Sequence, residues 1–276
     1  DLGPEDAEAA LALCRQDPVG SVLAGVQVEA IAQRWRMPGT ELLGVVSGSG
    51  ALEALCWAGA NLVPVNVHGE ARELVAGYVR SAGRRCSSIV GPAEQVLPLW
   101  DLLAPAWSRP REIRDDQPSL MIDTQPAVEP DPEVRVATVA DLPMVLPASV
   151  AMFTEEVGYD PLAAGSSYEA RVADLLAARR TYVRTEEGPD GRLQVVFKAD
   201  VGALALGVAQ VQGVWVHPDR RGEGLSVAGM AAVIRDVRER LAPTVSLYVN
   251  SYNAPALNAY RKVGFERVGT YATILF

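Results

Sequence analysis

The sequence has few of the residues that form disulfides or hold metals. Its 276 residues include three cysteines (Cys14, Cys56 and Cys86) and two histidines, with no Cys-x-x-Cys pair. An odd number of widely separated cysteines does not build a disulfide framework and favours a reducing compartment, so we expect a cytoplasmic protein. With so few thiol and imidazole ligands, we expect no metal site.

Long apolar runs and excess positive charge are also missing. No apolar run approaches the roughly 18–20 residues that a membrane helix needs. The acidic first residues lack the basic-then-apolar layout of a secretion signal. The formal net charge of −9 argues against nucleic-acid binding, which requires a basic face. We therefore expect neither a membrane nor a nucleic acid as partner, and the charge favours cationic small molecules or basic peptides.

Apolar residues, in contrast, make up 49% of the chain, enough for a sizeable core. The length suits one large domain or two ordinary ones. The stretch DTQPAVEPDPEVR (123–135) has three prolines, scattered acids and no hydrophobic period, which is typical of an extended linker. We therefore divide the chain into a first domain over 1–125, a linker over 126–133 and a second domain over 134–276.

Both halves predict strands and helices in a similar order. In the first half, two apolar runs around Gly-Ser-Gly predict a β-hairpin over 41–59. The pattern also predicts a strand over 61–67, an amphipathic helix over 69–83 and a closing strand over 119–123. In the second half a strand, a helix, a strand, a helix and a final strand are predicted over 208–217, 225–241, 244–250, 254–264 and 265–276.

The segment VWVHPDRRGEGLS (214–226) joins an apolar strand to a helix. Backbone N–H groups at a helix start carry partial positive charge, glycine lets a ligand approach the backbone, and the arginines add charge-assisted donors. The combination indicates an anion site, for which a diphosphate is the best fit. The alternative is a glycine-rich turn with solvated arginines. A P-loop is excluded, and Val227 stands where a dinucleotide fingerprint needs Gly or Ala.

A second motif, NSYNAPALNAYRKVGF (250–265), follows along the chain. Together with Arg-Gly-Glu-Gly-Leu-Ser (221–226), it resembles the GCN5-related N-acetyltransferase (GNAT) family. That family has an acetyl-CoA loop at the strand-to-helix turn and a later Asn-x-x-Ala…Tyr-x-x-x-Gly-Phe segment. Ser226 departs from the usual Gly or Ala. The resemblance covers residues 134–276.

The resemblance implies an α/β (α+β) fold. It would hold two GNAT-like domains in tandem, each a mixed, mostly antiparallel twisted sheet flanked by helices. It also implies that acetyl-CoA is the co-substrate and that its acetyl group passes to a small amine or peptide by direct attack in a ternary complex.

The resemblance also assigns site residues. Tyr260 would protonate the CoA thiolate as it leaves, which suits a phenol beside a forming thiolate. Asn253 would lie near the sulfur. The residues expected to bind acetyl-CoA are Val214, Trp215, Val216, Arg220, Arg221, Gly222, Glu223, Gly224, Leu225, Ser226, Asn253 and Tyr260.

The general base stays open. Many members of the family place Glu on the strand before the loop, where this chain has Gln210 and Gln212. Glu155 and Glu156 are our catalytic candidates, since the resemblance puts the first helices of the domain beside the acceptor; a solvated acidic helix end is the alternative. Further candidates are Asp200, His217 and a water-mediated path.

The first half resembles a diverged copy of the same fold, as in actinobacterial tandem proteins. No Arg-x-x-Gly-x-Gly follows the strand at 61–67, so we do not expect it to bind acetyl-CoA in the usual way. Cys86 is either a nucleophile or, as free thiols favour, a buried structural residue. Two hypotheses remain for the whole chain: an enzyme, or an acetyl-CoA-binding sensor or structural module without turnover. A monomer with pseudo-dimeric domains and a homodimer also both remain open.

Overall fold

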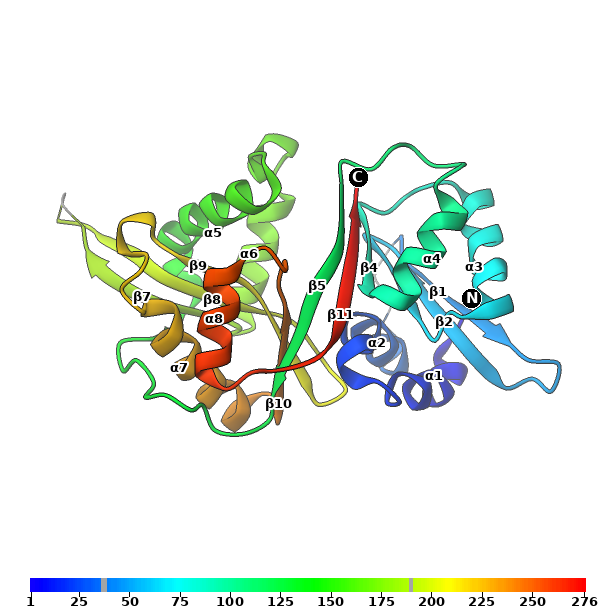
Figure 1. Cartoon of the computed structure of the whole chain (residues 1–276), viewed down its shortest axis with the longest axis horizontal. Helices are drawn as coiled ribbons and strands as arrows, with labels where there is room; N and C mark the ends of the chain where they lie inside the picture. The colour runs from blue at the N-terminus through cyan, green and yellow to red at the C-terminus, as the bar shows by residue number, and fades with distance from the viewer. Residues whose placement is uncertain (36–38, 189–190) are drawn as a thin grey trace.

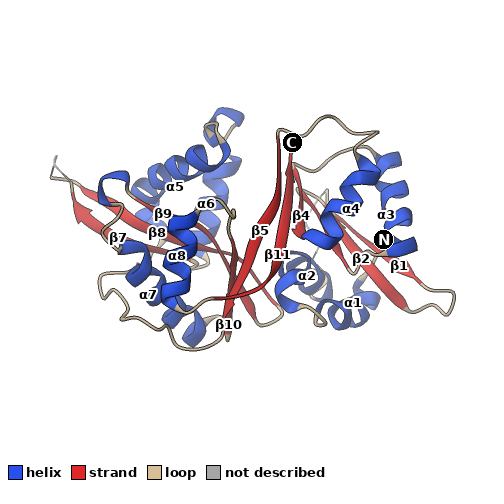
Figure 2. Cartoon of the chain, in the orientation of Figure 1, coloured by secondary structure: helices blue, strands red, loops and turns tan. Residues whose placement is uncertain are grey.

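The computed structural model describes residues 1–35, 39–188 and 191–276, apart from the side chain of Ala164 (Figures 1 and 2). The first half forms α1 (Ala7–Cys14), α2 (Pro18–Ala32), β1 (Glu41–Val46), β2 (Leu52–Ala58), β3 (Asn61–Val65), α3 (Gly69–Ala82), β4 (Ser88–Pro92), α4 (Ala93–Leu103) and β5 (Glu112–Ile122). The second half forms β6 (Arg135–Val136), α5 (Leu142–Val157), α6 (Ser167–Ala177), β7 (Thr181–Glu187), β8 (Leu193–Ala205), β9 (Val208–Val216), α7 (Leu225–Arg240), β10 (Thr244–Tyr248), α8 (Ala254–Val263) and β11 (Glu266–Leu275).

Apart from the two-residue strand β6 that begins the second half, the two halves repeat one order of elements: two helices, three antiparallel strands, then helix, strand, helix and strand. The predicted hairpin is confirmed as β1 and β2, which pair antiparallel. The third strand of each repeat runs antiparallel to the second and parallel to the fourth, as β3 does to β4 and β9 to β10. This repetition is the tandem arrangement that the resemblance implied.

The final strands of the two halves are exchanged. Strand β5 pairs with β10, β11 pairs with β4, and β5 and β11 pair with each other, side by side at the centre of Figure 1. The mixed, mostly antiparallel fold flanked by helices is confirmed, but the expectation of a separate sheet in each domain is corrected. The described residues form one eleven-stranded sheet in the order β1-β2-β3-β4-β11-β5-β10-β9-β8-β7-β6. The β5–β11 ladder joins them because it covers the open edges of both β4 and β10.

Helices cover both faces of the sheet. In the second half, α7 packs closely on β8, where a Cβ atom at Gly229 would stand 2.8 Å from the Phe197 ring, so glycine permits the close approach. Helix α2 joins the halves, because Glu29 Oε1 accepts a hydrogen bond from the N–H of Leu206 (2.8 Å) at the β8–β9 turn. Among the described helices, none is long and apolar enough to cross a bilayer.

Candidate functional site

Strands β9 and β10 separate as they approach the glycine loop. Their parallel ladder comprises the pairs Val208–Thr244, Ala209–Val245 and Gln210–Ser246. Strand β9 continues to Val216, paired on its other side with β8. Backbone groups of 214–216 that point toward β10 are therefore available to an extended ligand, which fits the expected pantetheine contact.

A β-bulge changes the direction of β9 before this free edge. Lys198 pairs with Trp215 and Asp200 with Gln212, so β9 has one more residue than β8 between these pairs. Gly213 lies in the bulge with φ +58. Bulges re-aim neighbouring backbone groups and are common beside functional sites. Sequence reasoning missed this feature, although an isolated glycine inside an apolar strand pattern is its usual signal.

The loop between β9 and α7 presents its backbone to open space. Gly222 and Gly224 have φ values of +83 and +84, and a Cβ atom at either position would meet nothing within 4 Å. Gly224 is the N-cap of α7. In the described part of the chain, no acceptor is found for the N–H groups of residues 222–226. Free N–H groups at a helix N-terminus suit a pyrophosphate, so these residues fit acetyl-CoA.

The two loop arginines are ion-paired and remain partly exposed. Arg221 Nη2 lies 2.6 Å from Glu155 Oε2, and Arg221 Nε donates to a β9 carbonyl at 3.1 Å. Arg220 Nη2 lies 2.8 Å from Glu223 Oε2, and Arg220 also pairs with Glu186. The hydrogen bond from Arg220 lowers the pKa of Glu223. Both guanidinium groups therefore already have carboxylate partners, whereas no acceptor is found for the backbone N–H groups of 222–226 among the described residues.

Tyr260 is a buried residue of α8, 7% exposed, with its ring edge-to-face against Phe265. Burial, reinforced by the charge of Glu156, raises the pKa of Tyr260 above the ordinary value of 10.0. The phenol therefore keeps its proton throughout the neutral range.

Two further predicted cofactor residues occupy helix starts. The Asn253 side chain caps α8, with Oδ1 accepting a hydrogen bond from the N–H of Ala256 at 3.2 Å. Ser226 lies in the first turn of α7, beside buried Leu225. Contact of these residues with acetyl-CoA stays a prediction.

Glu155 lies near the C-terminal end of α5 and faces the loop. Its Oε1 accepts a hydrogen bond from Trp215 Nε1 at 3.3 Å, while Oε2 pairs with Arg221. Its side chain is 45% exposed, so it is a surface residue with two polar partners. It ties α5 to the free edge of β9 and to the start of the loop.

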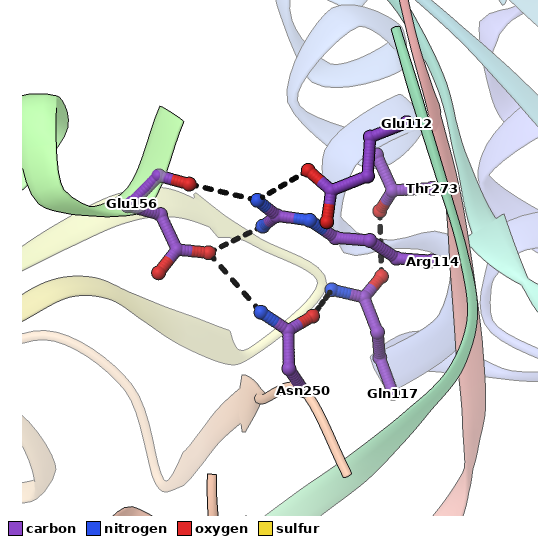
Figure 3. Close-up of polar contacts among 6 residues, drawn as sticks. All are labelled: Glu112, Arg114, Gln117, Glu156, Asn250 and Thr273. Atoms are coloured by element: carbon purple, nitrogen blue, oxygen red, sulfur yellow. Dashed lines mark hydrogen bonds and ion pairs between the residues drawn. The ribbon is translucent and has the colours of Figure 1, made fainter. Parts of the chain in front are cut away.

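Glu156, the next residue, faces the junction of the two halves. Its carboxylate pairs with Arg114 of β5 and accepts a hydrogen bond from Asn250 Nδ2 at 3.2 Å, just after β10 (Figure 3). Its charge contributes to the raised pKa of Tyr260. The structure thus separates two adjacent glutamates that the sequence left equivalent, and it places Glu156 within electrostatic reach of Tyr260. Arg114 had no sequence signal that linked it to the site, and Asn250, the first residue of the second motif, had been given no role.

The remaining candidate bases are engaged elsewhere. Asp200 accepts a hydrogen bond from Thr181 at 2.8 Å and is ion-paired with fully buried Lys198. His217 Nδ1 accepts a hydrogen bond from the N–H of Asp219 at 3.3 Å, which makes it a turn residue. Within the described ranges, no group of three or more His, Cys, Asp or Glu side chains is arranged to hold a metal ion.

The first half lacks the corresponding loop. Three residues connect β3 to α3, and the N–H of Val67 among them donates to Gln95 Oε1 at 3.0 Å. This donor is therefore already used inside the protein. Cys14, Cys56 and Cys86 are free and buried. Burial raises the pKa of Cys86, as expected for a structural thiol.

Two families match separate parts of the chain. Residues 40–145 match a domain of unknown function (DUF4081), and residues 173–265 match the Acetyltransferase (GNAT) family. Both motifs that carried the resemblance lie inside the second match. A mycothiol acetyltransferase of Saccharomonospora viridis is 48% identical over 63 residues, which are 23% of this chain and 21% of that relative. The match thus spans about a fifth of the length of that curated relative.

Solved structures share the whole fold. A tandem GNAT protein from the clavulanic acid biosynthesis pathway aligns over 99% of this chain and 97% of its own, with a TM-score of 0.53 and 15% identity. A GCN5-related N-acetyltransferase from Sphaerobacter thermophilus aligns over 99% of this chain and 92% of its own, with a TM-score of 0.57 and 17% identity. At these identities the likeness shows the fold alone.

Proposed function

We propose that this chain, whose residues 173–265 match the Acetyltransferase (GNAT) family, moves the acetyl group of acetyl-CoA to the amino group of a small acceptor. The observation that carries the proposal is the loop over 221–226. Its N–H groups lie free at the start of α7, next to the unpaired edge of β9. An anion at the helix N-terminus and an extended arm along β9 together describe the shape of a CoA thioester.

The chemistry is direct attack in a ternary complex. The acceptor ammonium first loses one proton, and its nitrogen then forms a bond to the acetyl carbon. The C–S bond breaks, Tyr260 gives its proton to the CoA thiolate, and the phenolate recovers a proton from the acetylated nitrogen. One proton is released per turnover. Holding both reactants in line supplies much of the acceleration in such reactions.

The acceptor class is part of the proposal. The chain carries a net charge of −9, which attracts cationic amines. The curated relative quoted above is named a mycothiol acetyltransferase, so mycothiol lacking its acetyl group belongs in the acceptor panel. Spermidine, an aminoglycoside, free amino acids and a peptide N-terminus complete the panel.

The first test is acetyl-CoA binding by calorimetry on the wild type, Gly224→Trp and Gly83→Trp. We expect wild-type affinity on the micromolar scale usual for enzyme substrates. Gly224→Trp should abolish binding by filling the space in front of the loop. Gly83→Trp is the matched control, because Gly83 also has a positive φ (+74), open space and a place at a helix end, away from the loop. Absence of wild-type binding would refute the proposal.

The second test follows release of free CoA with each amine in the panel. Release that depends on an amine supports the enzyme. Tight binding without release for any amine favours the alternative, a sensor or structural module that holds acetyl-CoA without turnover.

A further inference from the structure

A directed chain of hydrogen bonds crosses the junction of the two halves (Figure 3). Thr273 Oγ1 of β11 donates to Gln117 Oε1 of β5 at 2.7 Å, and Gln117 Nε2 donates to Asn250 Oδ1 at 2.9 Å. Asn250 Nδ2 then donates to Glu156 Oε1 at 3.2 Å. Each amide accepts on its oxygen and donates from its nitrogen, so the chain ends on an acceptor, the ionised carboxylate of Glu156.

Arg114, from the first half, fixes the same carboxylate from another side. Its Nη1 pairs with Glu156 Oε1, while Nη2 donates to the Glu156 carbonyl at 2.8 Å and to Glu112 Oε2 at 2.9 Å. The Arg114 side chain is only 10% exposed, whereas that of Glu156 is 49% exposed. Arg114 Nε is buried, and no partner for it is found among the described residues. A rigid, buried guanidinium therefore holds a carboxylate that opens to solvent.

The arrangement leaves negative charge at its open end. The contacts to Glu156 fall on Oε1 and on its carbonyl, and Oε2 receives no hydrogen bond within the described ranges. One guanidinium faces two carboxylates, Glu112 and Glu156, so one negative charge is uncompensated. The C-terminal end of α5 adds partial negative charge. The guanidinium of Arg171 is not hydrogen-bonded to Glu156 in the described structure, and its Nη2 lies 3.4 Å from Gln212 Oε1.

This free oxygen lies on the reacting side of the molecule. The preceding residue, Glu155, contacts Trp215 of β9 and Arg221 of the glycine loop, and Asn250, which donates to Glu156, lies between β10 and α8. Burial raises the pKa of Tyr260, and the charge of Glu156 adds to that effect. An ammonium group is the ligand that suits a single carboxylate oxygen that faces solvent and has no other hydrogen-bond donor.

We propose that the first half builds part of the acceptor site, with Arg114 as a positioning residue that orients Glu156 so that Oε2 receives the ammonium group of the acceptor. This inference rests on the proposed function. It gives the first half, which lacks a glycine loop, a role in acceptor binding. Acetyl-CoA binding, which uses the loop over 221–226, does not involve the pair.

The test measures steady-state kinetics with the amine that gives the fastest CoA release. Loss of a charge-assisted contact predicts that Arg114→Gln lowers kcat/KM for the amine by about 10- to 100-fold, mainly through KM, with KM for acetyl-CoA unchanged. Arg114→Lys should recover part of the loss. The control is Arg85→Gln, which breaks an Arg–Glu pair of 2.9 Å with Glu41 in the first half, away from the junction. It should leave both KM values unchanged.

A double-mutant cycle separates positioning from general damage. Glu156→Gln keeps the size of the side chain and removes its charge, so it should raise the amine KM as Arg114→Gln does. The double variant should then lose little more kcat/KM for the amine than either single variant, because both changes disrupt the same Arg114–Glu156 pair. Additive losses, or an amine KM that neither variant moves, would overturn the inference. If Arg114→Gln fails to fold, Arg114→Lys and Glu156→Gln carry the same test.

Failure of the proposed function is distinguished by the wild type. If the wild type transfers acetyl to no amine, both the function and this inference fall. If the wild type transfers acetyl and the Arg114 variants match it in amine KM, only the inference falls.

Discussion

The rings of Tyr248 and Tyr271 stack with centroids 4.8 Å apart and planes 13° apart, although β5 separates the two strands that carry them. The Tyr271 hydroxyl also donates to the carbonyls of Val19 and Gly20 in α2, at 2.8 and 3.1 Å. One side chain thus connects β11, β10 and a helix of the first half. These contacts stabilise the junction that places Glu156 beside Arg114.

Removal of that hydroxyl should therefore lower stability. We expect Tyr271→Phe to reduce the free energy of unfolding by about 1–2 kcal/mol, because the variant loses the hydrogen bond that its hydroxyl shares between the two α2 carbonyls. Urea unfolding of wild type and variant checks the value. Tyr252→Phe is the control, since Tyr252 is 73% exposed and should show no change. Equal midpoints for Tyr271→Phe and the wild type would contradict the expectation.

Tyr260→Phe should affect chemistry rather than folding. If Tyr260 protonates the leaving thiolate, the acetyl-transfer rate should fall by about 100-fold while acetyl-CoA affinity stays the same. Single-turnover rates and calorimetry measure the two quantities. Tyr182→Phe is the opposite control: its hydroxyl donates to Asp236 at 2.6 Å, so stability should fall and the rate should not. An unchanged rate in Tyr260→Phe would remove the acid role.

Asp141 should make stability depend on pH at the acid end. Hydrogen bonds from Arg135 and the Thr138 N–H lower the pKa of Asp141 from 3.8 to about 2. A carboxyl whose pKa is lower in the folded than in the unfolded chain stabilises the fold at any pH above its unfolded pKa. This stabilisation is lost as the pH falls from about 4 to 2. Asp141→Asn should therefore cost about 1–2 kcal/mol at neutral pH and almost nothing near pH 2. Urea unfolding across this range tests it, with exposed Asp219→Asn as the control.

The cysteines should be unreactive in the folded protein. Burial raises the pKa of Cys14 to about 12 and also raises the pKa of Cys56 and Cys86. Since the thiolate is the nucleophile, iodoacetamide at neutral pH should modify none of them until urea is added, when all three react. Mass spectrometry counts the adducts. Rapid modification of Cys86 alone in the folded protein would revive its role as a nucleophile.

The glycine loop over 221–226 was predictable because its signals are local. Gly222 and Gly224 lie between a strand and a helix, and the spacing of apolar residues in the sequence predicts both elements. The loop between them has the open backbone expected at a strand-to-helix turn. The buried position of Tyr260 was predictable for the same reason, because it lies on an amphipathic helix that ends at the C-cap Gly264.

The proposed acceptor side was not predictable, because the contact between Arg114 and Glu156 depends on which strands pair. The pattern predicted a closing strand at 119–123, whereas β5 spans Glu112–Ile122. Its first residues are charged, and Pro118 interrupts it, so the period is hidden. Arg114 approaches Glu156 only because β5 lies against β10 of the other half. No local pattern reports a pairing between such distant segments.

The exchanged strands also set an order for biosynthesis. Strand β4 is buried along its whole length, yet its neighbour β11 is made by the ribosome after every other element described here. During translation the nascent first half must therefore carry an apolar strand with an open edge, the kind of surface that chaperones bind and that aggregates. Synthesis of residues 266–275 closes the edges of β4 and β5 together, so we expect the two halves to reach the native state in a single late step.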